Sequence, residues 1–117
     1  MQPQTKETLS AAGININDGL ERFMGNEALL TRFLKRFLED SNYRTLLHAV
    51  SAGDQKQAMA ASHTLKGICG NLSMTALFDL LTQQVQLLRA GDWASACSLM
   101  PQISASYQMA VEAIKNI

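Results

Sequence analysis

Residues 26–38, NEALLTRFLKRFL, show the clearest amphipathic pattern in the chain. The apolar side chains of this stretch recur at three- and four-residue spacings: Leu29, Leu30, Phe33, Leu34, Phe37 and Leu38. Such spacing places them on one wide stripe of an α-helix. Asn26 precedes the stripe and is a favoured capping residue, so it predicts the start of the helix. The stretch therefore predicts a helix that buries Phe33 and Phe37 in a core.

Helical periodicity also covers most of the remaining chain. Upstream, Asn17 predicts the start of a short helix that stops at Gly25. The apolar residues of this helix are Leu20, Phe23 and Met24. Downstream, further helices are expected over residues 43–52, 54–72, 75–90 and 92–114, with Asp54 and Asp92 as the caps of the second and the last. Pro101 predicts a kink or a break in the last of these, because proline lacks the backbone donor and clashes with the preceding turn.

The pattern as a whole contains no strand alternation and only short links between helices. It predicts an all-α fold, an antiparallel four-helix bundle with a short accessory N-terminal helix. Residues 1–12 are polar and patternless, so we expect a flexible N-terminal segment there and one bundle domain over residues 13–117. Cys69 and Cys97 lie far apart and are expected to be structural thiols rather than a disulfide.

Composition excludes several classes of partner. Ten Lys and Arg residues balance ten Asp and Glu residues among 117 residues. Because the chain carries no net charge, it is not expected to bind nucleic acid or an anionic membrane. No apolar run reaches the roughly 20 residues of a membrane span, and the first residues do not resemble a signal peptide. A cytoplasmic location is therefore expected.

The second informative stretch is HTLKG at residues 63–67, followed by Gly70. On a helix, His63 lies about 200° around the axis from the nearest apolar-stripe positions, so it is expected to face solvent. Lys66 and Gly67 follow after three and four residues and share its face. Each mid-helix glycine costs about 1 kcal/mol relative to alanine. Gly67 would give another protein close access to the imidazole, whereas Gly70 would permit tight helix packing or end the helix.

These residue types point to phosphoryl chemistry. An imidazole is largely neutral and nucleophilic near pH 7, and it can form a covalent N-phosphoryl intermediate. The ammonium of Lys66 would disfavour the imidazolium form and pair with phosphate oxygens. We therefore predict that His63 accepts a phosphoryl group and that Lys66 stabilises it. A docking protein is expected to touch this face at Met59, Ser62, Lys66, Gly67 and Gly70, and no metal or cofactor site is predicted.

The remaining polar candidates have structural interpretations. His48 is expected to be a surface or capping residue, because nothing reactive surrounds it in the sequence. Ser62 and Thr64 flank His63 but lack the spacing of a hydrolase triad. A carboxylate-bridged metal bundle is disfavoured, because neither histidine follows a Glu at the required three-residue spacing.

The run HTLKGICGNL at residues 63–72 resembles the signature of the histidine phosphotransfer (HPt) domain family of two-component phosphorelays. Residues 13–14 and 19–26, GI and GLERFMGN, are similar to the opening segment of that family, and AGDW at residues 90–93 is similar to its last turn. The resemblance thus extends from about residue 13 to the C-terminus. It implies the four-helix bundle of the family, with the histidine exposed midway along one helix.

By this resemblance His63 would be the phosphorylated residue, Lys66 the phosphate-stabilising cation and Gly67 the glycine that gives access. Many members also have a glutamine on the neighbouring helix that orients the imidazole. The corresponding position here is Val85. The candidates for the orienting role are therefore Gln83, Gln84 and Gln86.

The resemblance implies a phosphorelay intermediate that carries a phosphoryl group on His63 between aspartates of receiver domains. Partners would be response-regulator receiver domains and a hybrid sensor histidine kinase, and Mg²⁺ would belong to the receiver only. The chain has no nucleotide-binding glycine loop, so it is expected to transfer phosphate without autokinase activity. A monomer is expected, since no heptad seam is present. The alternative is a non-catalytic bundle that binds or sequesters receivers and is indifferent to His63→Gln.

Overall fold

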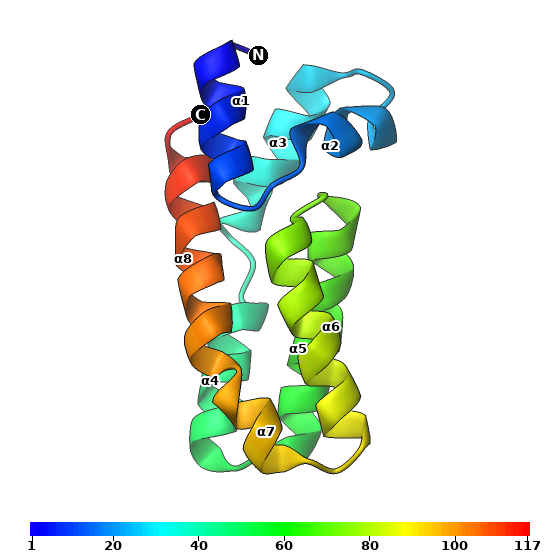
Figure 1. Cartoon of the computed structure of the whole chain (residues 1–117), viewed down its shortest axis with the longest axis vertical. Helices are drawn as coiled ribbons and strands as arrows, with labels where there is room; N and C mark the ends of the chain where they lie inside the picture. The colour runs from blue at the N-terminus through cyan, green and yellow to red at the C-terminus, as the bar shows by residue number, and fades with distance from the viewer.

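Helices account for all regular secondary structure in the computed structural model, which describes residues 1–117 (Figure 1). The elements in chain order are α1 (Pro3–Ala11), α2 (Ile16–Arg22), α3 (Glu27–Phe37), α4 (Asn42–Ala52), α5 (Gln55–Asn71), α6 (Thr75–Arg89), α7 (Trp93–Ser98) and α8 (Met100–Lys115). None of them combines the length and the apolar character that a membrane span requires. The predicted all-α fold is confirmed.

The bundle consists of α4, α5, α6 and α8, and successive members run in opposite directions (Figure 1). Helix α5 packs most extensively, with α4 on one side and α6 on the other. Helices α1, α2 and α3 lie at the upper end of the view, and the molecule measures 43 × 23 × 21 Å. The predicted antiparallel four-helix bundle is therefore confirmed, and α5, which carries the HTLKG stretch, is held between two neighbours.

Capping residues define the starts of three helices as the sequence predicts. The side-chain oxygens of Asn26, Asp54 and Asp92 accept hydrogen bonds from the backbone N–H three residues later, at 3.0, 3.0 and 3.1 Å. These bonds satisfy N–H groups that have no carbonyl partner within the helix. The break near Pro101 is also present, because α7 ends at Ser98 and α8 begins at Met100.

The boundaries of α2 differ from the prediction. Asn15, and not Asn17, caps this helix, and its side chain accepts a hydrogen bond from the Asp18 N–H at 3.1 Å. The helix starts earlier because Ile16 packs into the core, where it is 3% exposed. It ends at Arg22, two residues before the left-handed Met24.

The apolar stripe of α3 is narrower than predicted. Leu30, Leu34 and Phe37 are buried, whereas Phe33 is 38% exposed and Leu38 is 36% exposed. Phe33 lies about 60° around the helix axis from Leu30, so it falls at the edge of the face that the core covers. The prediction that Phe33 belongs to the core is therefore wrong, and its ring is available at the surface.

The N-terminal segment also departs from the prediction. Residues 3–11 form α1, which packs on α8, and Leu9 is completely buried. This helix was not predicted from the sequence, and the flexibility expected of residues 1–12 stays a prediction. Only one side chain of α1 enters the core, so the segment has no apolar stripe to reveal it. Its helical structure depends on the surface that α8 provides.

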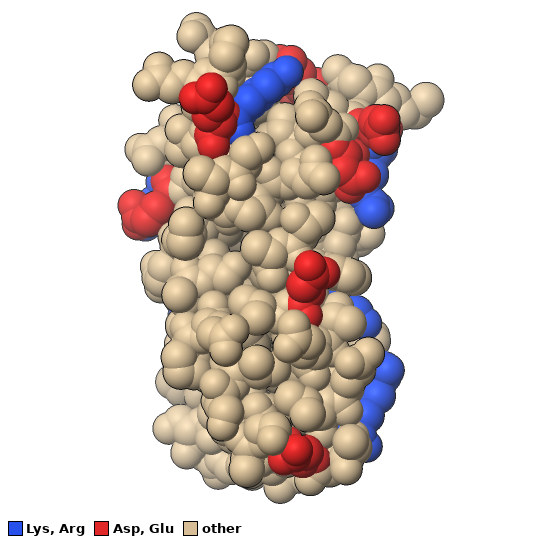
Figure 2. Space-filling view, in the orientation of Figure 1, with Lys and Arg blue, Asp and Glu red and all other residues tan.

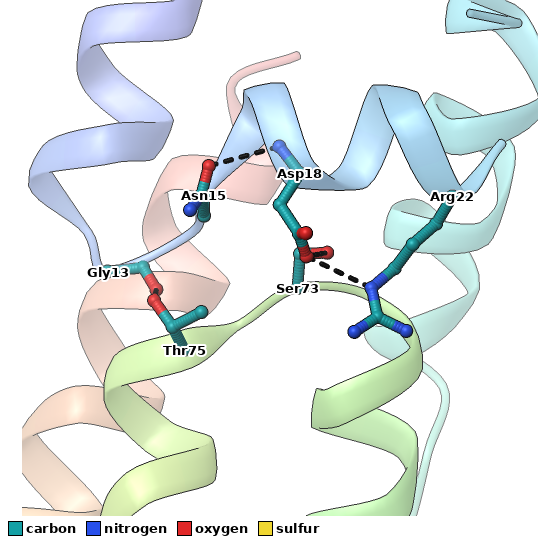
Figure 3. A network of polar contacts seen from close by, with 6 residues as sticks. All are labelled: Gly13, Asn15, Asp18, Arg22, Ser73 and Thr75. Atoms are coloured by element: carbon teal, nitrogen blue, oxygen red, sulfur yellow. Dashed lines mark hydrogen bonds and ion pairs between the residues drawn. The ribbon is translucent and has the colours of Figure 1, made fainter. Parts of the chain in front are cut away.

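A network of hydrogen bonds connects α2 to the turn between α5 and α6 (Figure 3). The carboxylate of Asp18 accepts hydrogen bonds from Ser73 Oγ at 2.6 Å and from Arg22 Nε at 3.0 Å. The Ser73 bond, and after it the Arg22 bond, lowers the pKa of Asp18. Thr75 Oγ1 donates to the Gly13 carbonyl at 3.3 Å in the same network. These contacts attach the N-terminal helices to the end of α5.

Candidate functional site

His63 lies near the middle of α5, and its side chain is exposed, as the helical register predicts. Leu65, two residues later, is completely buried and holds the opposite side of α5 in the core. The exposed face around His63 also includes Ala60 and Thr64. The site is therefore an open helix surface rather than a cleft, so an imidazole nitrogen is accessible to a second protein.

Lys66 and Gly67 lie beside the histidine as predicted. Lys66 is half-buried, and none of the three ion pairs of the chain involves it. Its ammonium is thus without a carboxylate partner, so an incoming anion meets no competing internal ion pair. A Cβ placed at Gly67 would find nothing within 4 Å. The open space at Gly67 is consistent with the predicted access to His63, and Met59 is half-buried one turn earlier.

Gly70 has a different environment. A Cβ at this position would lie 3.0 and 3.1 Å from ring atoms of Phe78 on α6. Such contacts are tighter than ordinary van der Waals contact, so the missing side chain lets α6 pack closely on α5. Of the two explanations that the sequence left open, tight helix packing is the one that the structure supports. Contact of Gly70 with a partner stays a prediction.

Ser62 cannot contact a partner. Its side chain is completely buried, and its Oγ donates a hydrogen bond to Oε1 of Gln84 at 2.8 Å. The prediction that Ser62 belongs to the docking face is therefore wrong. Ser62 lies about 100° around the helix axis from His63, which is enough to turn it from solvent into the interface with α6.

Gln84 does not contact the imidazole of His63. It is 1% exposed, and its Nε2 donates to the Ala96 carbonyl at 3.0 Å. Because both ends of this amide are engaged inside the bundle, the predicted contact with His63 is excluded for Gln84. Val85 is also buried. Gln83 and Gln86 are exposed on α6, and their candidacy as orienting residues stays a prediction.

An apolar groove near the end of α5 was not anticipated from the sequence. It has a volume of about 390 Å³. Its lining comes from α3, α5 and the segments that follow α2, α3 and α5: Phe23, Phe33, Arg36, Phe37, Asp40, Ile68, Asn71 and Leu72. The rings of Phe23 and Phe33 lie with centroids 5.5 Å apart, and the Arg36 guanidinium lies 5.7 Å from the Phe33 centroid. The position of Phe33 at the edge of its stripe is the sequence signal that could have indicated this groove.

Charged side chains form no large patch on the visible face of the bundle. Figure 2 shows that most of the visible face is uncharged and that Lys, Arg, Asp and Glu are scattered rather than clustered. The chain has no group of three or more His, Cys, Asp or Glu residues arranged to hold a metal ion. Cys69 is buried on α5, and burial raises the pKa of its thiol to about 12, so it stays protonated near neutral pH. His63 with Lys66 is therefore the clearest combination of a nucleophile and a cation on this surface.

Comparison with protein families gives one match, the Hpt domain, over residues 28–116. Comparisons with curated proteins and with solved structures find no match. The matched range covers well over half of the 117 residues and includes α4, α5, α6, α7 and α8. Together with the antiparallel helical bundle, this match shows that the chain belongs to the Hpt domain family, whose function is histidine phosphotransfer in phosphorelay signalling.

Proposed function

We propose that His63 is the phosphoacceptor of this Hpt domain. The observation that carries the proposal is the exposed imidazole on the middle of α5, followed at three and four residues by an unpaired ammonium and an open glycine. His48 is exposed as well, on α4, but no glycine or lysine lies one turn after it. It therefore provides a matched control for His63.

The proposed reaction is a reversible transfer between an aspartate and a histidine. A neutral ring nitrogen of His63 attacks the phosphorus of an aspartyl phosphate on a receiver domain. A P–N bond forms, the P–O bond breaks, and the aspartate carboxylate leaves with the electron pair. The reverse step passes the phosphoryl group to the aspartate of another receiver. Lys66 stabilises the phosphate oxygens as a point charge, and Mg²⁺ bound by the receiver supplies the remaining charge neutralisation.

Receiver domains exchange phosphate with Hpt domains, and we assign their contact surface here to Met59, Lys66 and Gly67 together with the apolar groove. Asn71, at the groove, is eight residues beyond His63, or about 12 Å along the helix. A protein patch of about 800 Å² would cover both places at once. The exposed ring of Phe33 offers the apolar area that an uncharged surface needs for binding. A hybrid sensor kinase with its own receiver domain would use the same surface.

A transfer experiment tests the role of His63. The chain is incubated with a receiver that carries a radiolabelled aspartyl phosphate, and label on the chain is then exposed to acid and to alkali. We expect uptake of acid-labile, alkali-stable label by the parent and by His48→Gln, and none by His63→Gln. Circular dichroism checks that all three retain the helical fold. Uptake of the same label by His63→Gln would refute the assignment, and full function of that variant in signalling would favour binding without chemistry.

A binding experiment tests the groove. Phe33→Ala removes an exposed ring from the proposed contact surface, and Met109→Ala removes an exposed apolar side chain from α8 as a matched control. We expect receiver binding to weaken by about tenfold for Phe33→Ala, which corresponds to about 1.4 kcal/mol, and to be unchanged for Met109→Ala. Titration calorimetry with the receiver measures both. Equal affinities for the two variants would remove the groove from the proposal.

A further inference from the structure

The buried amide of Gln84 connects three helices of the bundle. Its Oε1 accepts the hydrogen bond from Ser62 Oγ at 2.8 Å, on α5. Its Nε2 donates to the Ala96 carbonyl at 3.0 Å, on α7, and to Met100 Sδ at 3.2 Å, at the start of α8. A primary amide has one acceptor oxygen and two N–H donors, so every polar function of this side chain is engaged. The network is thus fully satisfied inside an otherwise apolar core.

The Ala96 carbonyl can accept the hydrogen bond from Gln84 because the chain of helical hydrogen bonds is interrupted between α7 and α8. Helix α7 ends at Ser98, and the Leu99 N–H reaches the Ala96 carbonyl with a long bond of 3.4 Å. Gln84 Nε2 approaches the same oxygen more closely, at 3.0 Å. The amide of Gln84 is therefore anchored on a backbone group, which cannot change rotamer as a side chain can. The bond to the Ala96 carbonyl therefore fixes the position of Gln84 Oε1, and with it the position at which the Ser62 hydroxyl is bound.

Ser62 immediately precedes His63 on α5. A serine within a helix commonly turns its hydroxyl back to the carbonyl four residues earlier, which here belongs to Ala58. In this structure the hydroxyl instead crosses to α6 and bonds to Gln84. The bond therefore sets how α5 is rotated and how far it is shifted relative to α6 at the residue next to the imidazole. A misplacement of about 1 Å at a reacting group can cost about a hundredfold in rate.

We propose that Ser62 and Gln84 are positioning residues for phosphoryl transfer, a proposal that rests on His63 being the phosphoacceptor. Their buried hydrogen bond, anchored on the Ala96 carbonyl, fixes the presentation of the imidazole through the backbone of α5. Gln84 thus orients the histidine from inside the bundle and never touches the ring. The receiver contact surface is untouched by this network, so loss of the bond affects the rate of transfer and not the affinity for the receiver.

Three variants separate positioning from stability. Ser62→Ala removes the hydroxyl and leaves Oε1 of Gln84 without a donor. Ser62→Ala/Gln84→Met removes both side-chain polar groups, so no side-chain polar atom of this pair is left unpaired, and the Ala96 carbonyl keeps only the bond from the Leu99 N–H. Ser104→Ala is the matched control, because it removes the hydrogen bond that Tyr43 Oη donates to Ser104 Oγ at 2.7 Å between α4 and α8, a bond that includes no residue of α5. Urea unfolding and circular dichroism measure the stability and the helical content of each variant.

The decisive measurement is the transfer rate from a phosphorylated receiver at varied receiver concentration. For Ser62→Ala and for the double variant, we expect the saturated rate to fall by about tenfold or more and the half-saturating concentration to stay within about twofold. Ser104→Ala is expected to lose stability but to keep the parent rate. A parent rate in the double variant, or equal rates in Ser62→Ala and Ser104→Ala, would overturn the proposal. If the double variant does not fold, the comparison of the two single variants decides the question.

The parent protein distinguishes this proposal from the one on which it rests. Absence of acid-labile, alkali-stable label on the parent would mean that the proposed carrier function itself has failed. Labelled parent with unimpaired Ser62→Ala would leave the carrier function intact and would reject only the positioning role.

Discussion

Consecutive residues of α5 have sharply different surroundings. Ser62 is sealed in the interface with α6, whereas His63 beside it faces solvent. The two glycines of the same helix differ in a similar way, because Gly67 borders open space whereas a Cβ at Gly70 would press against the ring of Phe78. The same residue type therefore borders open space at one position and leaves room for helix packing at the other. This difference leads to a prediction about their replacement by alanine.

Gly67→Ala is expected to raise the free energy of unfolding by about 1 kcal/mol, since alanine is the better helix former and its methyl group meets no atom. Gly70→Ala also replaces glycine by a better helix former, but its Cβ would lie 3.0 Å from the Phe78 ring. The resulting overpacking is expected to cancel or reverse the increase in the free energy of unfolding. Urea denaturation of the two variants measures the difference. Equal stabilisation by both substitutions would show that Gly70 is not required for the packing of α6.

A helix can be predicted from the sequence when it has a capping residue or an apolar periodicity of its own. The helices α3, α5 and α7 are capped by Asn26, Asp54 and Asp92, as predicted, because a cap acts on an N–H group only three residues away. Helix α1 has no side-chain cap and a single buried residue, and its one local signal is Pro3 at its first position. Whether such a segment is helical depends on the neighbouring α8.

Leu9→Ala tests the attachment of α1. Because Leu9 is completely buried, we expect the substitution to lower the free energy of unfolding by about 2 to 5 kcal/mol. Glu7→Ala, on the exposed side of the same helix, is expected to change it by no more than about 0.5 kcal/mol. Equilibrium unfolding in urea measures both variants. A loss of less than about 1 kcal/mol for Leu9→Ala would mean that α1 is not a stable part of the folded domain.

The whole molecule is held together by packing across the bundle. Tyr43 on α4 and Tyr107 on α8 stack with ring centroids 3.8 Å apart and an interplanar angle of 11°. Cys69 lies within the same core, completely buried. Burial, and to a smaller extent the charge of Asp40, raises the pKa of the Cys69 thiol to about 12. The reactivity of this thiol therefore reports on opening of the bundle as a whole.

Alkylation at pH 9 tests this prediction. An ordinary thiol is about half ionised at that pH, but Cys69 keeps its proton while the protein is folded. In a Cys97→Ser variant, which leaves Cys69 as the single thiol, we expect modification at the rate of global unfolding and acceleration by urea in parallel with unfolding. The complementary variant Cys69→Ser, which keeps the half-buried Cys97, is expected to react without unfolding. Rapid reaction of Cys69 in the native protein would contradict the packing described here. The raised pKa of Cys69 also makes stability depend on pH. The free energy of unfolding is expected to fall as the pH rises from 9 toward 12, because only the unfolded thiol ionises in that range.

Much of the candidate site was predictable because its determinants are local. The exposure of His63 follows from the helical repeat alone, as the structure confirms, and the same repeat places Lys66 and Gly67 one turn further along α5. The HTLKG stretch also carried the family resemblance that the Hpt match supports. By contrast, the sequence placed Ser62 on the docking face and Phe33 in the core, and both placements were wrong.

The sequence by itself therefore determined where α3 to α8 lie along the chain and which side of α5 His63 occupies. These features depend on hydrogen bonds and periodicities that span three or four residues. Only the tertiary structure decided that Ser62 bonds to Gln84, that Phe33 lines a groove and that α1 is a helix on α8. Each of these outcomes depends on which distant segment covers a given face, because burial and hydrogen-bond satisfaction are properties of two elements in contact and of neither element alone.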